Sequence, residues 1–260
     1  MSQEIAKQEI KAFPSLGRAV LLLLLQSFVV AGAFVAVEGL KTLHLVGPSP
    51  HLIMIEELLG LGVTLWIVRH WSQRTLPDLL ALKPVPNTIW GPLLLSIAGL
   101  YFFIMASAGF VFRFLPAPPA WLNEHFLTCS YLRLIVGAPL IEEVLFRGVI
   151  LGGFLQRYSP RKAILGSAVL FALAHLNLWQ LVPALVLGLF TGWVFSRTRS
   201  LWPVLAIHMV HNAVCCLGGV PNWAPMWILG LGLGLLAIGV LLLSQVFRSV
   251  NGQPLPFGPG

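Results

Sequence analysis

Long apolar runs, separated by short polar or Pro-rich breaks, are the dominant pattern along this chain. A helix needs roughly 20 apolar residues to cross about 30 Å of hydrocarbon, and the breaks leave about eight such segments. These segments run approximately over 19–39, 52–68, 89–112, 131–156, 163–178, 181–196, 201–219 and 223–247. The pattern predicts an all-α, polytopic membrane protein with about eight transmembrane helices.

Composition supports a membrane environment. Of the 260 residues, 57% are hydrophobic and 10% are charged, whereas about 25% of the residues in a soluble domain are charged. The formal charge of +7 does not indicate nucleic acid, because the basic residues stand singly between apolar runs and are not clustered on one face. We expect membrane lipid as a partner and no nucleic acid.

The basic residues also predict the topology. With the amino terminus in the cytoplasm, twelve of them fall inside and three outside, as the positive-inside rule requires. The inner set is Lys7, Lys11, Arg18, Arg69, Arg74, Lys83, Arg157, Arg161, Lys162, Arg197, Arg199 and Arg248, and the outer set is Lys41, Arg113 and Arg133. We therefore expect a multi-pass protein of the cell membrane with both termini cytoplasmic.

No internal repeat or second domain is evident. We expect residues 1–250 to form a single integral membrane domain, and the Gly- and Pro-rich tail 251–260 to be disordered.

The fourth predicted span carries three charged residues within two helical turns, in the sequence IEEVLFR. A charge in mid-span costs about 2.5 to 3.5 kcal/mol on insertion scales, so each needs a reason to be there. Glu143 and Arg147 are four apart and can form an ion pair on one face. Glu142 is rotated by about 100° from Glu143, so its carboxylate can face a different surface.

The fifth and seventh predicted spans add polar groups at comparable depth. The fifth contains His175 in FALAH, and the seventh contains His208 and Asn212, four apart, in HMVHN. A glutamate with a histidine can take a proton from water. A second histidine with an asparagine can donate hydrogen bonds to an oxyanion, at about 3 to 4 kcal/mol per donor. The sequence thus predicts a polar catalytic cavity in the helix bundle.

The three motifs, E-E-x-x-x-R, F-x-x-x-H and H-x-x-x-N, resemble those of the CAAX protease and bacteriocin-processing family. Prenyl endopeptidases of that family are eight-helix intramembrane glutamate proteases, and the resemblance covers roughly residues 89–219. It implies that Glu142 and His175 activate water and that His208 and Asn212 stabilise the oxyanion. Glu143 and Arg147 would be the structural ion pair.

The resemblance leaves the metal question open. Members are often described as metalloproteases, whereas the mechanism favoured by the resemblance uses no metal and no cofactor. Glu142, His175 and His208 could nevertheless ligate Zn²⁺. Other protease chemistries fit poorly, because the chain has no HExxH, no GxSG and a single aspartate, Asp78.

The expected function is therefore endoproteolysis near the carboxyl end of a membrane-anchored peptide or protein, which could be prenylated. One alternative is a non-catalytic immunity or scaffold protein of the same fold. Another is a transporter that uses Glu142 and the histidines as a proton relay, which we rank last because the chain lacks a repeat or an interrupted helix pair.

Overall fold

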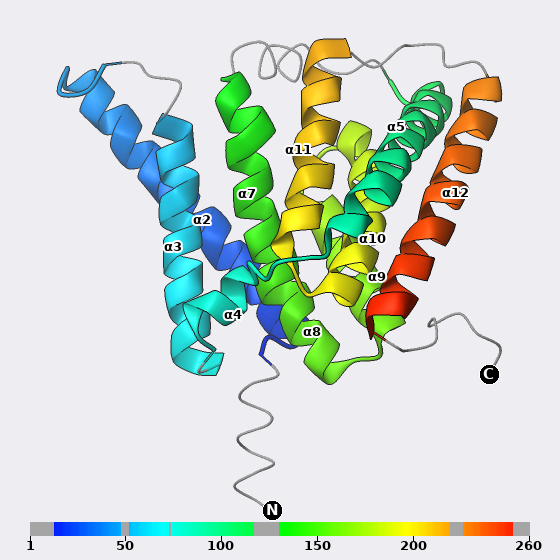
Figure 1. Ribbon diagram of the computed structural model, residues 1–260. Helices are drawn as coiled ribbons and strands as arrows, with labels where there is room; N and C mark the ends of the chain where they lie inside the picture. Colours follow the sequence, from blue (N-terminus) through cyan, green and yellow to red (C-terminus); the bar gives the residue numbers. More distant parts are fainter. Residues whose placement is uncertain (1–12, 48–51, 73, 117–129, 219–225, 252–260) are drawn as a thin grey trace, which may run out of the picture. The chain divides into compact units, whose positions relative to one another are not determined.

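The computed structural model describes residues 13–47, 52–72, 74–116, 130–218 and 226–251, and its regular structure there is entirely helical (Figure 1). Each of the eight predicted spans corresponds to a helical stretch. Seven are α2 (Leu16–Thr42), α3 (Leu52–Ser72), α5 (Trp90–Phe112), α9 (Pro160–Ala174), α10 (Leu178–Thr198), α11 (Leu201–Gly218) and α12 (Met226–Asn251). The predicted all-α fold is confirmed.

The remaining stretch, over 133–157, corresponds to the fourth predicted span, and its helical geometry changes along its length. It consists of η2 (Arg133–Gly137), α7 (Ala138–Glu143), η3 (Val144–Leu151) and α8 (Gly152–Arg157), where η2 and η3 are π-helical. Two short elements, α4 (Leu76–Leu80) and the 3₁₀ turn η1 (Asn87–Ile89), link α3 to α5. Wide π turns are rare and occur frequently at functional sites.

Four helical segments in the described part of the chain are long and apolar enough to cross a membrane: Leu16–Thr42, Asn87–Phe112, Leu178–Thr198 and Trp227–Ser249. Helix α3 has a suitable length but carries Glu56, Glu57 and Arg69, and α11 is apolar but shorter. The protein is therefore a multi-pass membrane protein, while the full count of eight crossings stays a prediction.

The chain divides into two compact units, unit 1 (Met1–Ala81 and Pro119–Ser159) and unit 2 (Leu82–Pro118 and Pro160–Gly260). Each unit is described by itself, and the single domain expected over 1–250 stays a prediction. In the predicted tail only Asn251 is described, as the last residue of α12, and 252–260 lie outside the described residues.

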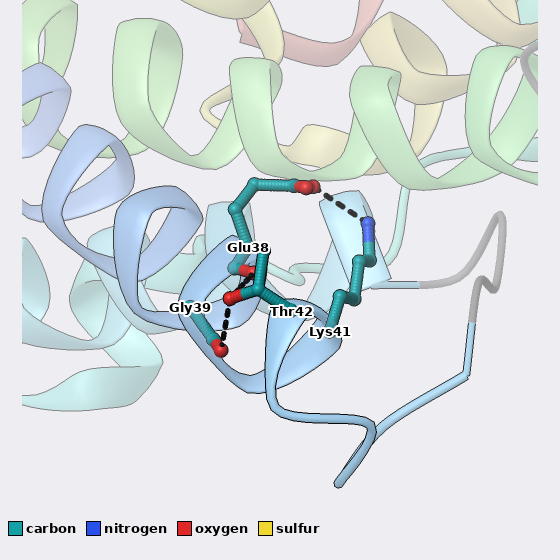
Figure 2. A network of polar contacts seen from close by, with 4 residues as sticks. All are labelled: Glu38, Gly39, Lys41 and Thr42. Atoms are coloured by element: carbon teal, nitrogen blue, oxygen red, sulfur yellow. Dashed lines mark hydrogen bonds and ion pairs between the residues drawn. The ribbon is translucent and has the colours of Figure 1, made fainter.

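In unit 1, α3 packs between α2 and the helix that carries the two glutamates. Thr64 Oγ1 donates to Gln26 Oε1 of α2 at 3.2 Å, and Arg133 Nε donates to Glu57 Oε2 of α3 at 3.3 Å. The last turn of α2 is closed by its own side chains, with Lys41 Nζ 2.7 Å from Glu38 Oε1 and Thr42 Oγ1 donating to Gly39 O at 2.7 Å (Figure 2). A cation at the carboxyl end of a helix, such as Lys41, is stabilised by the negative end of the helix dipole.

In unit 2, α5 and α12 run side by side with almost no space between their backbones (Figure 1). A Cβ atom on Gly99 would lie 2.2 Å from Leu236 N, and one on Gly239 would lie 2.3 Å from Ser96 Oγ. Glycine is needed at both positions because no side chain fits. Such small-residue contacts replace the hydrophobic effect as the source of helix association in lipid.

Candidate active site

The two adjacent glutamates of unit 1 lie in different environments. Glu143 is 0% exposed and its Oε2 lies 3.0 Å from Arg147 Nε, while Arg147 is itself 1% exposed. Glu142 is only half-buried. The rotation of about 100° between neighbouring helical residues explains the difference, because it places one carboxylate in the core and the other at the edge of the helix.

Arg74 forms hydrogen bonds to the π-helical stretch that follows the glutamates. Its Nη2 donates to Gly148 O at 3.0 Å and to Asp78 O at 3.2 Å, and its Nη1 donates to Val149 O at 3.5 Å. Widened turns leave carbonyls that need donors, and the guanidinium supplies several at once. The sequence predicted only that Arg74 lies on the cytoplasmic side. No local feature of the sequence identifies Arg74 as a hydrogen-bond partner of Gly148 and Val149, which lie 74 and 75 positions away.

His175 lies just beyond the end of α9, in unit 2. Its backbone N–H donates to Ala172 O at 3.3 Å, and Asn177 Nδ2 donates to His175 O at 3.3 Å. Asn177 also caps α10, because its Oδ1 accepts from Gln180 N at 2.8 Å. The fifth predicted span, 163–178, was therefore wrong at its end, since Leu176 and Leu178 continued the apolar run across the cap.

The ring of His175 has a defined tautomer. Its Nδ1 lies 2.9 Å from Phe171 O, one turn back along α9. A carbonyl oxygen can only accept, so Nδ1 carries the hydrogen and, in the neutral ring, Nε2 keeps the lone pair. This nitrogen can accept a hydrogen bond from water or bind a cation.

Phe171 connects the two histidines of the predicted site. Its buried ring meets the ring of His175 edge-on at 4.9 Å and that of His208, on α11, at 5.8 Å. Gly188 of α10 also leaves room for the ring, since a Cβ there would lie 3.1 Å from Phe171 Cδ1. Unit 2 thus gathers His175 and His208 around one aromatic ring.

The polar residues His208, His211 and Asn212 of α11 differ in how deeply they are buried. His208 is buried, and Asn212 is half-buried one turn further along the helix. His211 is buried and directed along its own helix, with its Nε2 3.6 Å from Cys215 Sγ. This contact lies within α11.

The four predicted catalytic residues are divided between the units, with Glu142 in unit 1 and His175, His208 and Asn212 in unit 2. Their convergence stays a prediction. The lone pair on His175 Nε2 suits Zn²⁺ as well as water, although no group of three or more His, Cys, Asp or Glu among the described residues could hold a metal ion. Glu142, His175 and His208 remain the predicted ligands if a metal binds.

Comparison with known proteins places the motif region in a family. The type II CAAX prenyl endopeptidase Rce1-like family matches residues 124–214, which contain all three motifs. The chain is 35% identical over 99 residues to UPF0177 protein YxdF of Lactococcus lactis subsp. lactis (strain IL1403), covering 38% of this chain and 52% of that protein. It is 31% identical over 78 residues to "Putative membrane peptidase YdiL" of Bacillus subtilis (strain 168), covering 30% and 32%.

The chain therefore matches about half the length of the first relative and about a third of the second. No solved structure matches it. The matched segment carries the three motifs in the order that the resemblance required, within an all-helical, multi-pass chain, and it is similar to the Rce1-like type II CAAX prenyl endopeptidases.

Proposed function

We propose that this protein is an intramembrane endopeptidase that hydrolyses a peptide bond near the carboxyl end of a membrane-associated substrate. The similarity of residues 124–214 to the Rce1-like family supports the reaction class. The observation that carries the proposal is the 2.9 Å contact of His175 Nδ1 with Phe171 O, from which we infer that Nδ1 carries the hydrogen. This hydrogen bond leaves Nε2 as an acceptor, which a group that orients a nucleophilic water must be.

In the proposed mechanism, Glu142 removes a proton from water while His175 Nε2 accepts that water's second hydrogen bond. The hydroxide attacks the scissile carbonyl, and Glu142 returns the proton to the leaving amine. His208 and Asn212 donate to the oxyanion of the tetrahedral intermediate. The buried ion pair of Glu143 with Arg147 lies on the same helical stretch as Glu142 and stabilises it.

The depth of His175 supports the presence of water at this site. Helix α9 is 15 residues long, so its end lies roughly 22 Å from its start, short of the hydrocarbon thickness of about 30 Å. The turn after it includes Leu176, which has φ of 54° and is 91% exposed. Non-helical backbone at membrane depth is tolerated only where it is buried in protein or lines a water-filled cavity. We therefore propose that this turn lines a water-filled cavity.

The test is peptidase activity of the purified protein in detergent on fluorogenic peptides, both prenylated and unprenylated at the carboxyl end. We expect Glu142→Gln to lower kcat by about 10²- to 10⁴-fold, the usual contribution of general base catalysis. Glu38→Gln is the matched control, because it removes a carboxylate of the same unit whose partner is Lys41. Equal loss in both variants would contradict the role of Glu142.

A chelator-treated sample separates the two ways of activating water. Activity that survives chelation and is lost in Glu142→Gln supports a glutamate mechanism. Loss under chelation, restored by Zn²⁺, would instead assign Glu142, His175 and His208 to a metal site. Folded protein that is inactive on every peptide would favour the non-catalytic immunity or scaffold function.

A further inference from the structure

The net charge of the protein resides entirely in unit 2. The sequence of this unit contains no Asp or Glu, and its basic residues are the seven Lys83, Arg113, Arg161, Lys162, Arg197, Arg199 and Arg248. Unit 1 contains the other nine basic residues and all nine acidic ones. The formal charge of +7 is therefore the charge of a single unit.

Three of these residues, Lys83, Arg199 and Arg248, gather at one end of unit 2, which we call the basic end. Ser200 Oγ donates to Lys83 O at 2.5 Å, so Lys83 lies beside Arg199. The ring of Phe247 meets that of Trp193 at 5.5 Å, so the end of α12 with Arg248 lies against the last turns of α10. All three basic side chains are exposed.

The basic end coincides with the ends of two membrane-spanning segments. Leu178–Thr198 and Trp227–Ser249 are both long and apolar enough to cross a bilayer, and Arg199 and Arg248 stand at their carboxyl ends. We expect residues at such positions to lie at the level of the lipid headgroups. Trp193 and the half-exposed Trp202 flank the same end, and tryptophan is enriched at this depth.

Arg199 occupies a backbone conformation that favours glycine. It ends α10 with φ of 49° and ψ of 34°, and its N–H donates to Phe195 O at 2.8 Å. A residue with a Cβ is strained in this left-handed region, and glycine is the usual choice at a helix end of this kind. Strained backbone conformations are often found at functional sites, where the function of the residue offsets the cost of the strain.

We propose that the basic end binds the phosphate headgroups of anionic phospholipids in the leaflet that it faces, which the charge pattern predicts to be the cytoplasmic one. Charge complementarity supports this partner, because the unit supplies positive charge and no carboxylate of its own. Each basic residue near an anionic surface contributes about a fivefold gain in affinity. None of these three basic residues is among the proposed catalytic residues.

The test is a titration of the detergent-solubilised protein with short-chain phosphatidylglycerol, phosphatidylcholine or inorganic phosphate, read as the shift in Tm. A ligand that binds only the folded state raises Tm by an amount that grows with the logarithm of the ligand concentration divided by Kd. We expect a shift with phosphatidylglycerol only, and about a hundredfold weaker apparent affinity in the triple variant Lys83→Gln, Arg199→Gln, Arg248→Gln. Arg113→Gln, at the predicted outer end of α5, is the matched control and should retain the shift.

Equal shifts with phosphatidylcholine, or a full response in the triple variant, would overturn the proposal. A shift reproduced by inorganic phosphate would assign the basic end to a soluble anion instead of a lipid. The variant Arg199→Gly guards against a folding artefact, because it relieves the left-handed strain. We expect its Tm without lipid to rise and its response to phosphatidylglycerol to fall, whereas a purely structural arginine would leave the lipid response unchanged.

Discussion

At the scale of single residues, Phe171 has the clearest consequences for the site. Its carbonyl holds the Nδ1–H of His175, and its ring, 1% exposed, contacts the rings of both His175 and His208. Edge-to-face aromatic pairs contribute about 0.5 to 1.5 kcal/mol beyond their buried area and fix ring orientation. Phe171 is therefore a positioning residue in the proposed mechanism.

We expect Phe171→Leu to lower kcat by about tenfold, because both histidine rings lose an aromatic contact of this strength. Phe190→Leu is the matched control, since Phe190 is also buried in unit 2 but its ring meets Trp193. Both variants should lose similar stability, so Tm separates folding from activity. A kcat that falls equally in the two would contradict the positioning role. The ¹⁵N shifts of His175 should keep the Nδ1–H pattern in both variants, because Phe171→Leu retains the backbone carbonyl that accepts from Nδ1.

A second residue-scale prediction concerns the buried pair. Glu143→Gln removes the charge that compensates Arg147, and breaking a buried ion pair from one side costs about 3 to 5 kcal/mol. Replacing both residues, as Glu143→Met with Arg147→Met, should recover most of this loss, because no unpaired charge remains. Thermal unfolding in detergent measures the stability of both variants. A double variant as unstable as the single one would contradict the explanation that the loss comes from an unpaired buried charge.

At the scale of helices, the contact of α5 with α12 depends on glycines at particular positions. Gly239→Ala would place a Cβ 2.3 Å from Ser96 Oγ and 2.8 Å from Ser96 N, so the helices must separate. We expect a loss of about 1 to 3 kcal/mol, typical of overpacking. Gly234→Ala on the same helix meets nothing within 4 Å and should be neutral or stabilising by up to about 1 kcal/mol. Unfolding measurements should therefore show a loss of stability in Gly239→Ala and no loss in Gly234→Ala.

The stretch over 133–157 shows how helix geometry affects the candidate site. The six residues of α7 lie between π-helical turns, with Glu143 at the end of α7 and Arg147 in η3. The sequence predicted one regular span here, and the spacing of four still brings the two side chains together. Arg74, from elsewhere in unit 1, donates hydrogen bonds to two carbonyls of this π-helical stretch.

At the scale of the whole molecule, the predicted topology can be tested with reporter fusions. We expect alkaline phosphatase joined after Gly47 or Arg113 to be active and, joined after Lys83 or Arg199, to be inactive, because basic loops stay in the cytoplasm. Green fluorescent protein at the carboxyl end should fluoresce for the same reason. Activity after Lys83 would contradict the orientation and would move the basic end to the outer leaflet.

Sequence alone determined the helical class, the approximate position of every long helix and the ion pair of Glu143 with Arg147. These features depend on local information, namely hydropathy over about 20 residues and the 3.6-residue period that places residues four apart on one face. The catalytic assignment of Glu142, His175, His208 and Asn212 also came from spacing and resemblance, and it stays a prediction.

Only the tertiary structure decided the end of α9 at Ala174, the tautomer of His175, the place of Phe171 between two histidines, the bracing by Arg74 and the close contact of α5 with α12. Most of these depend on which residues distant in the chain become neighbours, and even the tautomer depends on which acceptor the folded turn offers. Hydropathy cannot show this, because in a membrane protein nearly every helix is apolar on all sides, and the amino-acid pattern does not reveal which face meets which partner.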